Sequence, residues 1–430
     1  MRQLMDKCIS GLRWLIISAA IGLIGGTASA LFLFGLEEVT STREHLPWLL
    51  WLLPLGGALI SWLYAAYGSS AAKGNNLIIE QAYGDQAHIR VPFRMAPLVL
   101  LGTWTTHLFG GSAGREGTAV QLGGSLAEQV GARMKLSPQQ RSMLLQCGIS
   151  AGFGSVFGTP LAGAVFAVEL LAAHRSFRSR FIALLPSLIA GWTGDFVTRA
   201  WGIRHIQYSL GQLPSFSLQL LAQIVAASIL FGAAALLFSE LTHVLKQRFA
   251  AWIPNAPLRA FAGGFVIIAL VYIVGTRDYL GLSLPLLTHS FDEAVSPAAF
   301  ALKTLFTSIT LGAGFQGGEV TPLFVIGSAL GSALAGLFHV SVPLLAGIGL
   351  VSVFSGAANT PFACFIMGLE LFGTEGAVYL FIGCMISYAC SGHARIYRSQ
   401  RYGWVKASLP WVRNKSSDQT VDKQRQRTIG

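Results

Sequence analysis

Two short polar segments interrupt an apolar sequence, and each carries a glutamate where a helix is expected to begin. Residues 110–118 contain Glu116, and residues 314–322 contain Glu319. Backbone N–H groups at a helix start are unpaired and carry partial positive charge, so such a break can bind an anion or the glutamate's own carboxylate. If both compete for one place, protonating Glu116 releases its carboxylate and couples a proton to an anion.

Each of these residues also has a structural interpretation. Glu116 can cap its own helix and pair with Arg115. Glu319 lies in apolar sequence, where a carboxylate is costly unless it is paired, hydrated or protonated, so a functional role is favoured there. Thr321 can act as an N-cap or donate its hydroxyl to a bound anion.

Polar candidates also lie near both ends of the chain. Residues 73–78 include Asn75 before a helical pattern, although an ordinary turn between helices would look similar. Residues 391–397 close the last apolar run. From the residues alone Tyr397 is expected at the membrane interface, although its hydroxyl could also point into a cavity. His393 is expected to be a hydrogen-bonded interfacial side chain.

The first break also contains a pattern typical of hydrolases. Gly110, Ser112 and Gly114 match the Gly-x-Ser-x-Gly nucleophile motif, and His107 is nearby. That motif needs a strand before the serine and an acid beside the histidine, and neither is indicated. The five cysteines are scattered, and no zinc, nucleotide or phosphate-loop motif is present, so we predict no metal, no cofactor and no enzymatic activity.

The composition indicates that these breaks lie in a membrane protein. The 430 residues are 53% hydrophobic and 11% charged, whereas soluble domains average about 25% charged residues. Several apolar runs are shorter than the roughly 20 residues that a complete crossing needs. Irregular backbone is tolerated in a bilayer only where protein or a watery cavity surrounds it, so we expect broken and re-entrant helices packed among complete ones.

The basic residues indicate topology rather than nucleic-acid binding. There are 30 Lys and Arg against 19 Asp and Glu, and the basic residues gather at the chain ends and in a short segment at 175–180, which we expect to be a loop. By the positive-inside rule both termini are predicted to be cytoplasmic, with anionic lipid as a partner. The first apolar run, 12–36, is too long for a signal-peptide core and is expected to be a membrane anchor.

The polar motifs occur twice in the same order. The break at Gly114 is followed by Thr159-Pro160 and then Glu169, and the break at Gly317 is followed by Thr360-Pro361 and then Glu370. Duplicated halves of this kind are typical of transporters, whose binding sites lie where the breaks meet. We predict one domain over 1–430, with halves at about 12–210 and 211–400 and a tail at 401–430.

These motifs resemble the CLC family of chloride channels and proton-coupled anion antiporters over nearly the whole chain. The resemblance rests on Gly-Arg-Glu-Gly at 114–117, Pro-Leu-Ala-Gly at 160–163 with Glu169, and Gly-Gly-Glu-Val-Thr-Pro at 317–322. It implies an all-α membrane protein with a CLC-like fold and two internally repeated halves. Chloride-handling members typically have Gly-Ser-Gly-Ile-Pro where this chain has residues 74–78, and Gly-x-Phe-x-Pro where it has 318–322. The residues at these positions resemble those of the bacterial fluoride-exporting branch of the family.

The resemblance implies a role for individual residues. Glu116 becomes the gating and proton-carrying glutamate, and Glu319 is the acid specific to the branch. Leu170 occupies the position of the internal proton-relaying glutamate of many chloride antiporters, so that route is absent. The anion path is then lined by Asn75, Gly114, Arg115, Gly117, Val320, Thr321 and Tyr397.

The resemblance also implies a function and a setting. We expect a multi-pass protein of the bacterial inner membrane, a homodimer, that exports fluoride in exchange for protons. Fluoride is small and tightly hydrated, so its site needs several well-aimed donors, each contributing roughly 1.5–3 kcal/mol. The rival hypotheses are a chloride-selective antiporter or passive anion channel of the same fold, and an intramembrane hydrolase using Ser112 and His107.

Overall fold

The computed structural model describes residues 2–84, 90–171, 177–401 and 406. Helices dominate, as predicted, and the β contact found among these residues is an isolated bridge between Gly114 and Gly318. Most of the predicted tail and Arg175 lie outside the described residues. The segment 175–180 is not a loop throughout, because a helix already begins at Phe177.

The helices follow one another with short connections. The first part of the chain forms α1 (Arg2–His45), α2 (Leu53–Leu63), α3 (Asn75–Tyr83), α4 (Met95–Leu108), α5 (Glu116–Arg133), α6 (Pro138–Phe157), α7 (Pro160–Glu169) and α8 (Phe177–Ala200). The second forms α9 (Leu218–Trp252), α10 (Ala256–Val274), α11 (Leu284–Asp292), α12 (Ala299–Ala313), α13 (Val320–Phe338), α14 (Val342–Ala358), α15 (Pro361–Phe372) and α16 (Ala377–Cys390). Single-turn helices at Pro47–Leu52, Tyr64–Gly68 and Ser69–Lys73 flank α2.

Helix lengths agree with a membrane protein built from complete and incomplete crossings. Six helical segments in the described residues are long and apolar enough to cross a bilayer, and α9 has the highest mean hydropathy, 2.3 over its best window. Five further apolar helices have only 10–17 residues, among them α7, α12 and α15. These short helices are the broken elements that the short apolar runs predicted.

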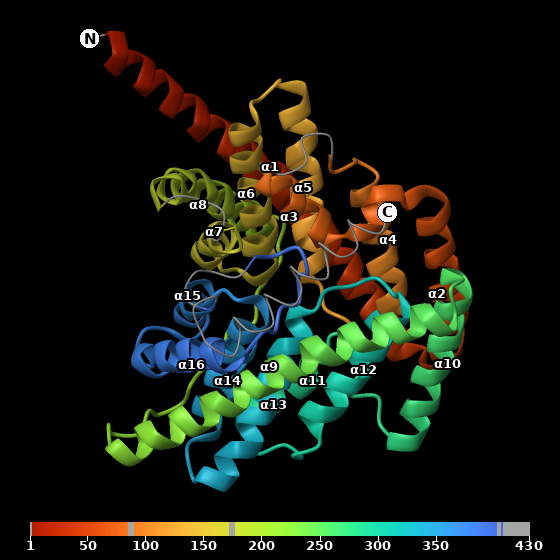
Figure 1. Ribbon diagram of the computed structural model, residues 1–430. Coiled ribbons are helices and arrows are strands. Elements are labelled where there is room, and N and C mark those ends of the chain that lie inside the picture. Colours follow the sequence, from red (N-terminus) through yellow and green to blue (C-terminus); the bar gives the residue numbers. More distant parts are fainter. Residues whose placement is uncertain (1, 85–89, 172–176, 402–405, 407–430) are drawn as a thin grey trace, which may run out of the picture.

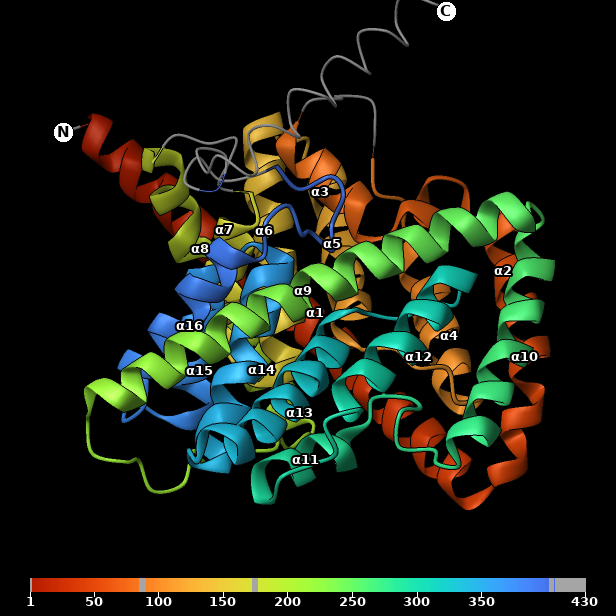
Figure 2. The same ribbon diagram turned by 60° about the horizontal axis from the view of Figure 1, so that its bottom comes forward.

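The helices are arranged around a central group that carries both breaks. Helices α7, α8, α15 and α16 form one side of the molecule, and α2 and α10 form the opposite side (Figures 1 and 2). The long helix α9 runs obliquely across α12, α13 and α14, with which it is in contact. Helices α5 and α13, which begin at the two breaks, therefore start inside the protein.

Two equivalent helix pairs hold these starts in place through very close packing. A Cβ atom on Gly123 of α5 would lie 2.0 Å from the carbonyl oxygen of Gly148 in α6. A Cβ on Gly327 of α13 would lie 2.1 Å from the carbonyl oxygen of Gly349 in α14. Only glycine allows backbones this close, and small residues serve the same purpose in other membrane proteins.

Candidate anion and proton site

The two breaks lie directly against each other. Gly114 N donates to Gly318 O at 2.7 Å, and Gly318 N donates to Gly114 O at 2.8 Å. A Cβ on Gly318 would lie 2.8 Å from Gly117 N, so the approach leaves no room for a side chain. The amino ends of α5 and α13 consequently share one buried space, and the partial positive charges of both helix ends act there.

The carboxylate of Glu116 occupies this shared space. Glu116 is fully buried. Its Oε2 accepts the backbone N–H of Arg115 at 3.2 Å and that of Thr321 at 3.0 Å, and its Oε1 accepts the Thr321 hydroxyl. The carboxylate thus extends from the start of α5 to the first turn of α13, where it takes the place that an anion would take.

The same contacts decide between the sequence-based interpretations of Thr321. Helix α13 begins at Val320, so Thr321 lies inside the first turn and is not its N-cap. Both its N–H and its hydroxyl point at the Glu116 carboxylate, and Arg115 contributes its backbone N–H to the same group. Thr321 therefore has the donor geometry that binding an anion requires.

Asn75 reaches the site from a third helix start. It is the first residue of α3 and is buried. A Cβ on Gly117 would lie 3.0 Å from Asn75 Nδ2 and 3.1 Å from the Cα of Gly318, so the three residues are in contact. The side-chain amide of Asn75 therefore lies against Gly117 in the first break.

Tyr397 lies in the interior rather than at the membrane interface. It is 3% exposed and packs in the same core cluster as Val320. Its hydroxyl is near enough to interact electrostatically with both Glu116 and Glu319. By contrast, His393 is the polar surface residue expected, because its Nε2 lies 3.2 Å from Glu240 Oε1.

Glu319 faces a pocket that is also lined by residues following α16. The residue is half-buried and immediately precedes α13. The pocket has a volume of about 150 Å³ and is lined by Asn76, Phe238, Ser239, Thr242, His243, Lys246, Leu311, Glu319, Ile396 and Arg398. The start of α13 therefore lies next to both carboxylates, since Thr321 binds Glu116 and Glu319 immediately precedes the helix.

Arg115 lines cavities other than the pocket that Glu319 faces. Its guanidinium lies 5.9 Å from the centre of the Phe157 ring. With Thr321 and Phe324 it lines a small cavity of about 40 Å³, and with Glu37 and Arg204 it lines an open pocket of about 560 Å³. Arg115, whose backbone N–H binds the Glu116 carboxylate, therefore lines both the small cavity and the open pocket.

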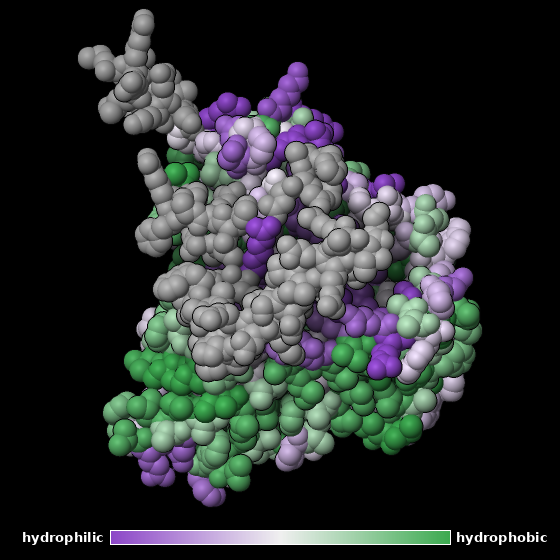
Figure 3. Space-filling view, viewed as in Figure 1, coloured by the Kyte–Doolittle hydropathy of each residue, from purple (hydrophilic) through white to green (hydrophobic). Residues whose placement is uncertain are grey.

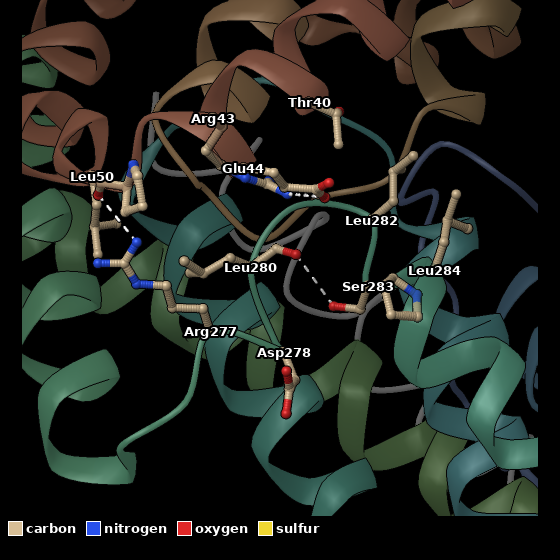
Figure 4. A pocket seen from close by; sticks show the side chains of 12 residues that line it. Thr40, Arg43, Glu44, Leu50, Arg277, Asp278, Leu280, Leu282, Ser283 and Leu284 are labelled. Carbon is tan, nitrogen blue, oxygen red and sulfur yellow. Dashed lines mark hydrogen bonds and ion pairs between the residues drawn. The ribbon is translucent and has the colours of Figure 1, made fainter.

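A second pocket of about 510 Å³ lies beside that opening and shares Thr40, Glu44, Leu282 and Leu284 with it. Figure 4 shows Arg43 and Glu44 paired above it, at 3.4 Å, with Arg277 and Asp278 at its other edge. Both signs of charge are present, so this entrance has no single-sign field that would select anions.

His205 lines the same entrance in the connection after α8. Burial, followed by the positive charges of Arg115 and Arg199, lowers the pKa of His205 to about 4. The imidazole is therefore neutral at physiological pH. It adds no charge to the entrance.

Ser112 and His107 do not form a catalytic pair. The Ser112 hydroxyl is 2.9 Å from Thr307 Oγ1 and accepts from Lys303 Nζ at 2.9 Å. No hydrogen bond joins the buried His107 to Ser112 in the part of the chain that the structure describes. The hydrolase hypothesis has no supporting geometry.

The sequence analysis missed Lys303. This lysine is fully buried in α12 and donates to two hydroxyls, on Ser112 and Ser283, and to two backbone carbonyls. It links α12 to the first break and so fixes the backbone before Glu116. A single charged residue within a helix of 15 residues was the available signal.

Leu170 and Glu169 lie together at the carboxyl end of α7. Leu170 is buried in the main apolar cluster. Glu169 accepts the N–H groups of Phe362 and Ala363, at 3.2 and 2.8 Å, at the start of α15. Glu370 at the end of α15 accepts the N–H groups at the start of α7 in the same way, at 3.0 and 2.7 Å. Both carboxylates therefore cap helices.

Comparison with known proteins identifies the family. Residues 56–392 match the family described as voltage gated chloride channel. The chain belongs to this family. A chloride/fluoride channel protein of Pseudomonas syringae is 46% identical over 404 residues, which cover 93% of this chain and 88% of that protein. An H⁺/Cl⁻ exchange transporter of Cronobacter sakazakii is 26% identical over 86% of this chain and 84% of its own length.

Solved structures agree with this assignment. The crystal structure of a CLC-type fluoride/proton antiporter superimposes with a TM-score of 0.86 and 33% identity, over 91% of this chain and 98% of that one. The chain is therefore a multi-pass membrane protein of the CLC family that transports ions. The predicted fold class is confirmed.

Proposed function

We propose that this protein exports fluoride in exchange for protons. The observation that carries the proposal is the Glu116 carboxylate, which is held at the start of α13 by the N–H and hydroxyl of Thr321 and by the N–H of Arg115. Donors that hold a small, charged oxygen this closely suit fluoride, which loses a tight hydration shell and needs strong hydrogen bonds in return. The solved fluoride/proton antiporter and the chloride/fluoride channel protein support the same substrate.

The transport step follows from competition for these donors. Ionised Glu116 fills the place of the anion, and fluoride enters when the carboxylate leaves. Protonation removes the carboxylate's charge, weakens its hold on the helix start and lets the side chain move away. The Glu116 carboxyl group therefore carries a proton while fluoride binds the donors that the carboxylate has left. This couples proton movement to fluoride movement through a single residue.

The residues around this place have distinct proposed roles. Asn75, Thr321 and Tyr397 offer side-chain donors, and Gly114, Arg115, Gly117 and Val320 offer backbone around the breaks. Glu319 takes up or releases the proton on the side of its pocket. The face with the C-terminal segment is proposed to be cytoplasmic, in the bacterial inner membrane, with both chain termini on that side and a homodimer as the assembly.

Proteoliposomes loaded with fluoride or chloride test the proposal when anion efflux and internal pH are recorded together. We expect fluoride efflux with proton uptake, and little chloride efflux. Glu116→Gln should abolish proton movement, because an amide cannot carry the proton. Equal chloride transport would refute the fluoride selectivity and favour the second candidate, a chloride antiporter, which the match to the H⁺/Cl⁻ exchange transporter supports. Fluoride flux without proton movement would instead indicate a passive channel.

A further inference from the structure

Four polar residues of α9 line the pocket beside Glu319. Ser239, Thr242, His243 and Lys246 stand at positions i, i+3, i+4 and i+7, so they lie on one face of the helix. The rest of α9 is the most apolar span in the described residues. Polar side chains on one face of such a helix line a hydrated cavity, because lipid would not tolerate them.

Most of this stripe is engaged in holding the protein together. Ser239 donates to a carbonyl of its own helix, Thr242 is 2.8 Å from Ser308 Oγ, and His243 Nε2 is 2.9 Å from the carbonyl oxygen of Arg395. Lys246 differs from its neighbours. It is exposed at the pocket and forms no hydrogen bond or ion pair with any residue that the structure describes.

The charges around the pocket favour an anion. Lys246 and Arg398 are both exposed cations that line it, and neither forms an ion pair within the described chain. The carboxylate in the pocket is that of Glu319, on which Lys246 acts electrostatically. Figure 3 shows hydrophilic residues gathered on this side of the molecule above a broad apolar band.

We propose that Lys246 captures fluoride at this pocket and delivers it to the donors around Glu116, an inference that rests on the proposed function. An unpaired ammonium at the mouth of a narrow polar cavity raises the local concentration of anions and their rate of entry. Because Lys246 is exposed, its charge is not offset by a large desolvation cost. Because Lys246 and Glu319 line the same pocket, the arriving fluoride and the proton on Glu319 would meet in one cavity.

A charge series at residue 246 tests this role. The variants Lys246→Arg, Lys246→Gln and Lys246→Glu are compared in everted vesicles, with the pocket face outside, and in right-side-out vesicles. The rate of fluoride uptake is measured against fluoride concentration in both. In everted vesicles we expect KM to stay near the wild-type value for Arg, to rise about three- to tenfold for Gln and to rise further for Glu, with kcat little changed. The rise should shrink at high salt, which screens exposed charges.

The control is Arg248→Gln, which removes an exposed cation two residues further along α9 that does not line the pocket. It should leave KM unchanged. An unchanged KM in Lys246→Gln would overturn the inference, and so would an equal rise in both vesicle orientations or in Arg248→Gln. Recording proton exchange by the wild type distinguishes the two proposals. If the wild type exchanges fluoride for protons but substitutions at residue 246 have no effect, only the role of Lys246 is overturned.

Discussion

Removing the Thr321 hydroxyl should weaken fluoride binding strongly while leaving the protein folded. Valine has nearly the shape of threonine but donates no hydrogen bond, so in Thr321→Val the Glu116 carboxylate keeps only the two backbone donors, at 3.2 and 3.0 Å. A hydrogen bond to a charged group contributes about 1.5–3 kcal/mol, and each 1.36 kcal/mol is a factor of ten. If fluoride binds the same hydroxyl, the affinity of Thr321→Val for fluoride should be roughly ten- to hundredfold lower than that of the wild type.

Fluoride titration calorimetry on the purified protein measures this loss directly, and paired fluoride and pH recordings measure its effect on transport. The ratio of protons to fluoride should be unchanged, because Glu116 is still present. Thr321→Ser keeps the hydroxyl and should stay close to the wild type. Fluoride affinity that is the same in the valine variant as in the wild type, or a serine variant as weak as the valine variant, would refute the reasoning.

Three further predictions concern residues away from the anion. Glu169→Gln and Glu370→Gln should each lower the unfolding free energy by about 1–2 kcal/mol, seen as a lower melting temperature, yet keep proton coupling, because these carboxylates cap helices. His205→Gln should leave the pH dependence of transport between pH 5 and 8 unchanged, because the pKa of His205 in the folded protein is about 4. In the unfolded chain this histidine binds its proton near pH 6.5, so lowering the pH from 7 to 5 favours the unfolded state of the wild type. The wild type should therefore lose more stability than the variant over this range. Gly327→Ala should destabilise the protein by about 1–3 kcal/mol, because the new Cβ would meet a carbonyl oxygen of α14 at 2.1 Å, whereas Gly336→Ala, with nothing within 4 Å, should not.

The sequence predicted the chemistry of the breaks because their residue types are unusual for apolar sequence. A carboxylate, a hydroxyl and several glycines beside an expected helix start restrict the interpretation to anion binding or capping. The structure joins Glu116 to Thr321 by hydrogen bonds and places Asn75 against Gly117. Helix packing through Gly123 and Gly327 explains part of the glycine content.

Three-dimensional contacts between distant segments could not be predicted in this way. Well over a hundred residues separate Glu169 from the α15 amides that it binds, and the same is true of Lys303 and Ser112. The sequence around each of these residues does not indicate its partner. Thr321 was ambiguous for a related reason. Its role depends on whether α13 begins one residue before it or after it, and helix ends are the least certain feature of any sequence pattern.

The capping of α15 by Glu169 restricts where the proton can travel. A carboxylate that accepts two backbone N–H groups is held in place, and protonating it would remove part of that cap. Leu170 beside it is apolar and buried, so the end of α7 offers no mobile acid. Glu319, in contrast, lines a polar pocket together with Ile396 and Arg398, and it precedes Thr321, which holds Glu116, by two residues. We therefore propose that protons from that face reach Glu116 through Glu319, in the cavity to which Lys246 is proposed to bring the anion.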